Sequence, residues 1–560
     1  MTLWAFASRR RAAALVDRLS VPGLVALALA LSTSDCSDEF VPSTQDLTIA
    51  PAVGWLDTMS VTDTATFSIR LAIDGRMNGV GLPVVDWNST DENVVRVTQK
   101  TAGAGQTSWD TLSQKLEALV EAHGPGKARV RVSVQRGSQV FAFGSAITVM
   151  QRWTSVSASW VALYGSPPSH SCAISVLAIV FCWGETSGLL GNGLATSSLV
   201  PVTVPNLPGL ESITAGGDFS CGTAFVGVGF CWGSNEFGQI GDGSQAARYL
   251  AIDIGRGILF TSLKAGSTST CGTRADGGVY CWGLGNFGQL GIGSSLPYCD
   301  PGILMTAIQC ETMATLIRVP RFYSGIQMRE FCTGQSSSFS GCTFSVSGLS
   351  VGRNHACGIA PVGAAFCWGS NDHGQIGGPV LDNLCILSIG GPCSMTPAIV
   401  GAADTGWAQG ATYAGFTGPK FTSVSAGWAH TCGIETNGQT YCWGAGTSGQ
   451  LGNGLLVDAA APVAVVNAPA FASVHAGGNF TCGLTVTGDV YCWGAGFTTT
   501  ATKISGSLKF TMMSTGYDHS CGITQPNGAI YCWGNGNAGQ LGTGTRTSSP
   551  TPVRVAEPAL

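Results

Sequence analysis

The chain has 560 residues, of which 44% are hydrophobic and only 11% are charged, and its formal net charge is −5. Disorder requires high charge and low hydrophobicity, so this composition excludes a largely disordered chain. Lysine and arginine form no run beyond residues 9–11, and nucleic-acid-binding proteins normally carry a basic patch, so no nucleic-acid partner is expected.

Residues 1–36 have the pattern of an export signal. Three arginines at residues 9–11 precede an apolar stretch at residues 21–31, which is shorter than the ~20 residues needed to cross a bilayer. Cys36 follows this stretch, and the arrangement resembles a bacterial lipoprotein signal, in which such a cysteine carries the lipid. Asp35 stands where that signal has Gly, Ala or Ser. The alternative is an ordinary cleaved signal peptide; both predict export, either to the bacterial cell envelope as a lipoprotein or into the medium.

Residues 43–150 contain short motifs of a second kind. Residues 62–69 alternate polar and apolar side chains, as a half-buried strand does. Val-Asp-Trp-Asn-Ser-Thr-Asp follows at residues 85–91 and Gly-Lys-Ala-Arg-Val-Arg-Val at residues 126–132. These motifs resemble those of the group-two bacterial immunoglobulin-like domain. The resemblance implies a small β-sandwich over residues 43–150.

One segment of this region has apolar residues at helical spacing. They follow Ser108, which is suited to an N-cap, and precede Gly124. The spacing predicts a short amphipathic helix over residues 108–123, covering one edge of the sandwich. The apolar residues are Trp109, Leu112, Leu116, Leu119 and Val120.

The remainder of the chain is repetitive. The tripeptide Cys-Trp-Gly occurs seven times, and three of the six intervals between its tryptophans are 49 or 50 residues. Each unit combines short runs of Val, Thr, Tyr and Phe with Gly, Asn and Pro, which predicts strands and turns. Strands that are apolar on both faces suit blades stacked around an axis. The tryptophans are Trp183, Trp232, Trp282, Trp368, Trp443, Trp493 and Trp533.

The fifth unit is the clearest copy of the repeat. It has Gly-Trp-Ala-His-Thr-Cys-Gly at residues 427–433, Tyr-Cys-Trp-Gly at residues 441–444 and Gly-Gln-Leu-Gly-Asn-Gly at residues 449–454. The unit resembles the regulator-of-chromosome-condensation repeat. Seven copies imply an all-β protein in which a seven-bladed β-propeller over residues 153–560 follows the immunoglobulin-like domain. The units depart from the pattern at Phe219, Ser269 and Phe480 in place of His and at Leu189 in place of Gln, and unit six lacks the Gly-Gln-Leu loop.

Fourteen of the 21 cysteines form seven pairs at a regular spacing within the units. In an antiparallel hairpin with its turn at Asn437, Cys432 and Cys442 face each other at a separation that suits a disulfide. Zinc is the competing interpretation, but no Cys-x-x-Cys spacing occurs. The regular pairing predicts disulfides and an oxidising compartment. The pairs are Cys172 with Cys182, Cys221 with Cys231, Cys271 with Cys281, Cys357 with Cys367, Cys432 with Cys442, Cys482 with Cys492 and Cys521 with Cys532.

Four long inserts interrupt the propeller at residues 294–315, 320–343, 378–396 and 401–419. Long loops on a rigid scaffold often carry binding sites, although insertions without function are the alternative. Deleting the first and third inserts together is expected to abolish partner binding and to leave thermal unfolding largely unchanged. Six cysteines lie in the inserts with their connectivity open: Cys299, Cys310, Cys332, Cys342, Cys385 and Cys393. The candidate partner-binding aromatics are Tyr298, Phe322, Tyr323, Trp407 and Tyr413.

Motifs with catalytic chemistry are scarce. Gly-Leu-Ser-Val-Gly at residues 348–352 matches a nucleophile elbow, but the segment aligns with strand residues of other units. Four histidines share one repeat position, which places them on different blades and predicts structural hydrogen bonds. We expect no catalytic, cofactor-binding or metal-binding residues. The histidines are His170, His355, His430 and His519.

These observations favour a non-enzymatic binding or scaffold protein of the bacterial envelope or exterior. The immunoglobulin-like domain would act as a spacer and the propeller of a monomer as an interaction platform for an unknown protein or glycan, with membrane contact only through the lipid on Cys36. The family resemblance implies a second candidate, a guanine-nucleotide exchange factor. A propeller lyase or hydrolase is the third.

Overall fold

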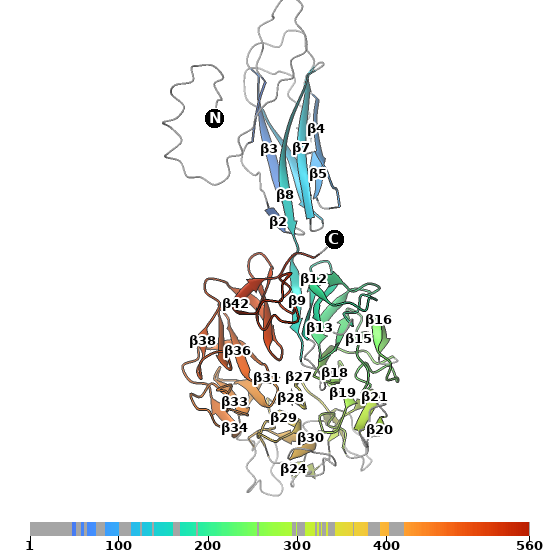
Figure 1. Ribbon diagram of the computed structural model, residues 1–560, viewed down its shortest axis with the longest axis vertical. Coiled ribbons are helices and arrows are strands. Elements are labelled where there is room, and N and C mark those ends of the chain that lie inside the picture. Colours follow the sequence, from blue (N-terminus) through green and yellow to red (C-terminus); the bar gives the residue numbers. More distant parts are fainter. Residues whose placement is uncertain are drawn as a thin grey trace, which may run out of the picture. The chain divides into compact units, whose positions relative to one another are not determined.

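A computed structural model describes residues 47–558 with gaps, the longest being residues 74–83, 100–113, 161–168, 300–307, 334–341, 379–391 and 402–418. The chain divides into two compact units, Met1–Met150 and Gln151–Leu560, here called unit 1 and unit 2 (Figure 1). Cys36 and the predicted export signal lie outside the described residues.

Unit 1 contains two four-stranded sheets. Their strand orders are β1-β3-β6-β5 and β2-β8-β7-β4. Val95 and Val120 of the first sheet and Val130 and Val132 of the second are fully buried. The immunoglobulin-like assignment stays a prediction. The strands are β1 (Leu47–Pro51), β2 (Thr58–Ser60), β3 (Thr64–Ile73), β4 (Val84–Ser89), β5 (Val95–Gln99), β6 (Gln114–Ala122), β7 (Gly126–Arg136) and β8 (Gln139–Met150).

The helix expected over residues 108–123 is wrong where the structure describes that segment, because Gln114–Ala122 forms strand β6. Strand β6 pairs with β3 on one side and with β5 on the other. Leu116, Ala118 and Val120 also alternate along the sequence, so the segment fits a period of two as well as a helical period. Pairing with two neighbouring strands decides between the two periods, since strand formation depends strongly on tertiary context.

The described part of unit 2 contains seven main antiparallel sheets, each built from strands that lie close together in the sequence, and two small sheets of two and three strands. We call the seven main sheets blades 1 to 7. Blade 1 has β9 (Trp153–Ala158), β10 (Ser169–Ser175), β11 (Val180–Glu185) and β12 (Ser198–Thr203), and blade 2 has β13 (Leu210–Ala215), β14 (Phe219–Ala224), β15 (Gly229–Gly233) and β16 (Arg248–Ile254). Blade 3 has β17 (Ser262–Ala265), β18 (Ser269–Thr273), β19 (Val279–Leu284) and β21 (Ile308–Leu316), with the short β20 (Tyr298–Cys299) added at its edge.

The other four blades follow the same order of strands. Blade 4 has β27 (Gly348–Val351), β28 (His355–Ile359), β29 (Ala365–Ser370) and β30 (Cys393–Ile399), and blade 5 has β31 (Phe421–Ala426), β32 (His430–Glu435), β33 (Thr440–Gly444) and β34 (Ala459–Ala464). Blade 6 has β35 (Phe471–Ala476), β36 (Phe480–Thr485), β37 (Val490–Gly494) and β38 (Thr502–Lys503), and blade 7 has β39 (Phe510–Thr515), β40 (His519–Thr524), β41 (Ile530–Gly534) and β42 (Ser549–Arg554).

The first strand of every blade faces the axis of a closed ring. First strands of successive blades contact one another, and β39 of blade 7 contacts β9 of blade 1. The last strands, such as β16, β34 and β38, lie at the rim (Figure 1). The ring closes by hydrogen bonds from Ala158 N to Ser514 Oγ at 3.1 Å and from Tyr517 N to Ser159 O at 3.0 Å. Because each blade is contiguous in sequence, blades 7 and 1 pack together without sharing a strand.

The core consists of similar clusters repeated between neighbouring blades. In one of them Trp443 of blade 5 packs against Ile376 and against Cys357 and Cys367 of blade 4. Apolar residues on both faces of the strands are therefore buried, as the sequence predicts. All seven tryptophans of the Cys-Trp-Gly tripeptides are at most 1% exposed.

The limits of two predicted inserts need correction. The insert placed at residues 294–315 includes most of β21, and the one placed at residues 378–396 includes the start of β30. Both strands are the outermost of the main four in their blades. Deleting these ranges would remove blade strands, so the expectation of unchanged thermal unfolding is wrong for them. The other two inserts, at residues 320–343 and 401–419, begin after β21 and β30. The insert at residues 320–343 contains β23 (Phe322–Tyr323), β24 (Ile326–Gln327), β25 (Cys332–Thr333) and the start of β26 (Cys342–Phe344). Strand β26 also pairs with β22 (Arg318–Val319).

Candidate functional site

Each blade carries one disulfide between its second and third strands. In blade 5 Cys432 and Cys442 are direct partners in the β32–β33 register, and their Cα atoms are 4.0 Å apart. The seven bonds join the cysteine pairs expected from the spacing. Cys393, one of the six cysteines with open connectivity, is also disulfide-bonded.

The four histidines of the shared repeat position each bridge to the next blade. His430 Nε2 lies 2.8 Å from Thr481 Oγ1, and the Thr481 hydroxyl donates to Gln450 O at 2.9 Å. Since this hydroxyl uses its proton on the carbonyl, it accepts from an Nε2–H of His430. The other bridges are His170 to Ser220 at 2.8 Å, His355 to Thr431 at 2.9 Å and His519 to Ser171 at 2.8 Å.

Three of these histidines, His170, His355 and His430, have little capacity for acid–base chemistry at neutral pH. Burial lowers the pKa of His355 to about 3, and burial together with the charge of His355 does the same for His430. Burial, helped by the charge of His519, lowers the pKa of His170 to about 3. The imidazoles of His170, His355 and His430 are therefore neutral hydrogen-bond donors, in agreement with the structural role expected for this position.

The Gly-Gln-Leu-Gly loop of one blade forms a hydrogen bond with the tryptophan of the next blade and packs against its ring. The indole of Trp493 donates to Gln450 O at 2.9 Å. Gly452 has a φ of +69°, and a Cβ there would lie 2.7 Å from the Trp493 indole nitrogen. Glycine is therefore required both for the turn and for the close approach to the ring. Trp183, Trp282, Trp368 and Trp443 make the same bond to the carbonyl oxygens of Gln540, Gln239, Gln289 and Gln375.

Two tryptophans lack this bond, and both follow a blade whose loop departs from the repeat. The indole nitrogens of Trp232 and Trp533 are buried without a hydrogen-bond partner. Trp232 follows the blade in which Leu189 stands in place of Gln, and Trp533 follows blade 6, which has no Gly-Gln-Leu loop. Two particular blade junctions thus lack the hydrogen bond from the tryptophan, and the architecture is unchanged.

A ring of backbone hydrogen bonds surrounds one end of the propeller axis. It is made by residues of the turns between the first and second strands of neighbouring blades. Arg353 N donates to Gly427 O at 3.2 Å, Trp428 N to Gly477 O at 3.0 Å and Tyr517 N to Ser159 O at 3.0 Å. The ring fixes the backbone from which the intervening side chains project.

Three of these side chains form the most distinctive surface group of the described residues. The Arg353 guanidinium carbon lies 3.7 Å from the centre of the Trp428 ring, and the Trp428 and Tyr517 rings are 4.5 Å apart. Gly478 occupies the equivalent position of blade 6 and leaves the space through which the rings of blades 5 and 7 meet. All three side chains are half-buried. We call Arg353, Trp428 and Tyr517 the axial cluster.

Two carboxyl groups beside this ring differ in protonation. Burial, with the charge of Glu236, raises the pKa of Asp218 to about 7. Burial also acts on Asp518, but hydrogen bonds from His519, Asn535 and Gln540 hold the pKa of Asp518 below its ordinary value. The difference follows from the repeat, because blade 2 has Phe219 where blade 7 has His519.

The aromatics predicted to bind a partner are not brought together by the described residues. Tyr298 lies on β20, and Phe322 and Tyr323 lie on β23. Strands β20 and β23 belong to separate sheets. Trp407 and Tyr413 lie outside the described residues. The axial cluster was missed because its members are far apart in sequence. Its signal is the position after the repeat glycine, which holds Trp, Tyr or Arg in some units and Gly or Ser in others.

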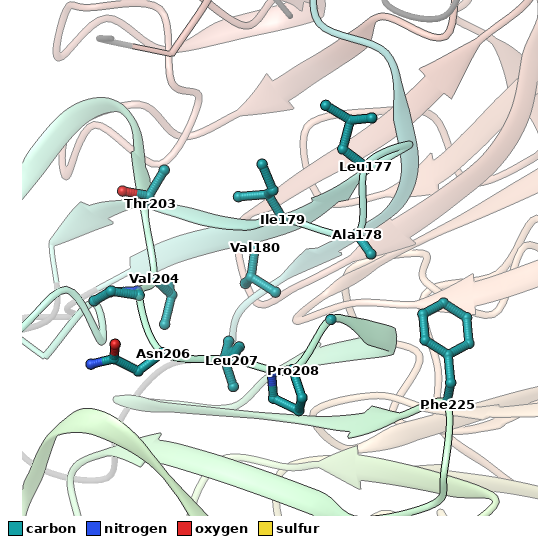
Figure 2. A pocket seen from close by; sticks show the side chains of 12 residues that line it. Leu177, Ala178, Ile179, Val180, Thr203, Val204, Asn206, Leu207, Pro208 and Phe225 are labelled. Carbon is teal, nitrogen blue, oxygen red and sulfur yellow. The ribbon is translucent and has the colours of Figure 1, made fainter. Parts of the chain in front are cut away.

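A second surface feature is an apolar groove of about 460 Å³ between blades 1 and 2. Figure 2 shows Leu177 and Ile179 from the hairpin turn of blade 1, Leu207 from the connection between the blades and Phe225 from the turn of blade 2. Leu177, Ile179 and Phe225 are 43%, 42% and 67% exposed. Contiguous exposed apolar side chains of this kind are typical of contact surfaces.

Catalytic arrangements find little support in the described part of the chain. Ser350 lies on strand β27, and its hydroxyl accepts from Ala426 N at 2.9 Å, so the segment is a blade strand and not a nucleophile elbow. Within the described ranges no group of three or more His, Cys, Asp or Glu is placed to hold a metal ion. Across the same residues no helix is long and apolar enough to span a membrane.

Seven repeated sheets in a closed ring define unit 2 as a seven-bladed β-propeller. Its repeats are Regulator of chromosome condensation (RCC1) repeats, as the sequence predicts. This family matches residues 276–314, 437–484 and 527–559, and a second description of the same repeat matches residues 260–289, 346–375, 421–450 and 513–540.

Comparison with known proteins agrees with this assignment. The chain is 24% identical over 410 residues to the Ultraviolet-B receptor UVR8 of Arabidopsis thaliana, covering 69% of this chain and 79% of the receptor. It is 24% identical over 209 residues to the Probable E3 ubiquitin-protein ligase HERC3 of Homo sapiens, covering 37% of this chain but only 14% of the ligase. The match therefore spans a small part of that ligase.

Two solved structures have the same fold. Yeast RCC1 (Prp20) bound to Kap60 superposes with a TM-score of 0.51 at 19% identity, covering 71% of this chain and 85% of that chain. Prp20p from Saccharomyces cerevisiae superposes with a TM-score of 0.50 at 20% identity, covering 71% and 88%. At these identities the likeness extends to the fold alone.

Proposed function

We propose that this chain is a non-enzymatic binding protein of an oxidising compartment, exported to the bacterial envelope or exterior, in which the propeller is a rigid platform for a protein or glycan partner. The observation that carries this proposal is the disulfide repeated in every blade. Disulfides persist outside the reducing cytosol. The export signal expected over residues 1–36 supports the same location, and Cys36 is the candidate lipid anchor.

The axial cluster is the surface we assign to the partner, together with the inserts that carry Tyr298, Phe322, Tyr323, Trp407 and Tyr413. Trp, Tyr and Arg are the residue types most enriched at interface hot spots. Stacking among Arg353, Trp428 and Tyr517 holds these side chains in place before binding, which lowers the ordering cost of association. The ring of backbone hydrogen bonds also fixes these residues before binding and so lowers the ordering cost of association.

Replacing Trp428 and Tyr517 by serine should reduce partner capture at least tenfold while the propeller stays folded. Serine is suitable because Ser267 occupies the equivalent position in blade 3. The measurement is quantitative affinity capture from envelope extract, with thermal unfolding recorded for each variant. Tyr249→Ala is the matched control, because Tyr249 is 48% exposed and lies on the rim strand β16. Undiminished capture by the double variant would move the site away from the axial cluster.

The exchange-factor alternative makes an opposite prediction. The yeast Prp20p structure was described together with its binding to Gsp1p and histones. A shared fold at 20% identity does not carry surface contacts with it. We expect the purified protein not to accelerate GDP release from a Ran-type GTPase beyond a buffer control, as measured by fluorescent-nucleotide release. A saturable, dose-dependent acceleration would make nucleotide exchange the leading function.

A further inference from the structure

One repeat position supplies a ring of polar side chains around the axis. The position lies on the first strand of each blade, paired with the first cysteine of the disulfide; Ser425 opposite Cys432 in blade 5 is an example. Five blades have a hydroxyl here and two have a basic side chain. The residues are Ser157, Thr214, Lys264, Ser350, Ser425, His475 and Ser514.

The five hydroxyls have a shared hydrogen-bond pattern. Each accepts from a backbone N–H of the next blade; Ser425 Oγ, for example, accepts from Ala476 N at 2.9 Å. Ser157, Thr214, Ser350 and Ser514 accept in the same way at 2.9 to 3.1 Å. The hydroxyl protons are not needed for these bonds, so they remain able to donate to a ligand near the axis.

Lys264 and His475 replace the hydroxyl in blades 3 and 6, on well-separated parts of the ring. Burial lowers the pKa of Lys264, although solvent reaches its side chain. Burial and the charge of Lys264 lower the pKa of His475 to about 4. Lys264 and His475 lie opposite Cys271 and Cys482 on first strands, in the same register position as the five hydroxyls, and these strands surround the axis.

These two basic groups have no acidic partner. Among the described residues neither Lys264 nor His475 forms an ion pair, and no carboxylate contributes to either pKa shift. The imidazole of His475 makes one hydrogen bond, to Ser473 Oγ at 2.9 Å. Lys264 is exposed and His475 is half-buried, so both side chains are open to solvent and to a dissolved ligand. A soluble anion would supply the missing negative charge.

We propose that Lys264, His475 and the surrounding hydroxyls form a binding site for a small oxyanion, with inorganic phosphate as its simplest representative. The ammonium group and the hydroxyls supply hydrogen-bond donors from several directions around the axis. Charge-assisted bonds of this kind are the strong class of hydrogen bond. A bound anion also offsets the positive charge of Lys264.

The test is calorimetric titration of the intact protein with inorganic phosphate at pH 6, repeated with sulfate and with chloride. We expect saturable binding of the two oxyanions. Lys264→Thr should weaken phosphate binding at least tenfold, and His475→Ser should weaken it less. Both variants restore the hydroxyl found at this position in other blades, so both should fold. Lys503→Thr removes the same charge from a surface lysine paired with Asp489 and should leave binding unchanged.

The absence of saturable phosphate binding by the unmodified protein would overturn the proposal. Equal binding by the Lys264→Thr and unmodified proteins would overturn it too, since the anion would then bind elsewhere. If Lys264→Thr does not fold, Lys264→Gln serves the same comparison. Partner capture through the axial cluster is measured separately, so either proposal can fail while the other stands.

Discussion

Trp443→Ala should lower the free energy of unfolding by about 3–5 kcal/mol, the cost typical of removing a large aromatic from a core. Trp443 is fully buried between blades 4 and 5, where it packs beside Phe421 with ring centres 5.6 Å apart. Its indole also donates to Gln375 O at 3.0 Å. Neighbouring backbone in the blades cannot collapse into the space, so the variant leaves a cavity, and the Gln375 carbonyl keeps only its bond from the Thr431 hydroxyl at 2.8 Å. Denaturant unfolding followed by circular dichroism measures the loss.

A comparison of two phenylalanine variants separates the hydrogen bond from the packing. Trp443→Phe removes volume and the bond to Gln375, whereas Trp533→Phe removes volume only, because the Trp533 indole has no partner. Trp443→Phe should therefore cost about 1 kcal/mol more than Trp533→Phe, the usual net value of a hydrogen bond. Equal losses would mean that the bond between blade and loop contributes nothing to stability.

The propeller was predictable because its information is local and repeated. Cys432, Asn437 and Cys442 lie within one hairpin, so their spacing alone predicts the register that the structure has. Trp443 and the Gly-Gln-Leu loop recur at nearly the same offset, and repetition separates them from chance motifs. The junctions at Trp232 and Trp533, which lack the hydrogen bond from the tryptophan, could also be inferred, since each departure is visible in the unit that precedes the tryptophan.

The axial features were not predictable in the same way, because closure of the ring creates them. Arg353, Trp428 and Tyr517 belong to three different units, and nothing in the local sequence of any unit indicates that they meet. Lys264 and His475 are departures from a Ser or Thr position that is recognised only once the units are aligned in register. Contacts between units follow from ring geometry, and one unit contains no information on that geometry.

The misassigned helix has a different cause. Residues 114–122 satisfy both a helical period and a strand period, and their partners β3 and β5 lie tens of residues away. The insert limits failed for a related reason, since β21 and β30 lie far from the strands they pair with. Local sequence patterns therefore predict the central hairpin of each blade. The outermost strand of a blade depends on pairing between segments that are distant in the sequence.

Reduction of the seven disulfides should abolish the cooperative unfolding transition of the propeller. Each bond closes a short loop, with a sequence separation of 10 in blade 6, and such a loop is worth ~2–3 kcal/mol in the loop-entropy model. Seven bonds then amount to ~14–21 kcal/mol, more than the ~5–15 kcal/mol of net stability usual for a folded domain. The bonded cysteines are fully buried, so the reductant must be equilibrated with the protein in mild denaturant before thermal unfolding is recorded.

A single pair provides the graded version of this experiment. Replacing Cys482 and Cys492 together by alanine should lower the free energy of unfolding by about 2–3 kcal/mol and leave the other six bonds intact. Non-reducing peptide mapping of the exported protein checks the starting state, in which all seven pairs should be oxidised. Free thiols at these positions would contradict both the stability argument and the assignment to an oxidising compartment. Since the second and third strands of each blade already pair in register, the bond acts mainly by restricting the unfolded chain, and each blade should respond independently of the rest.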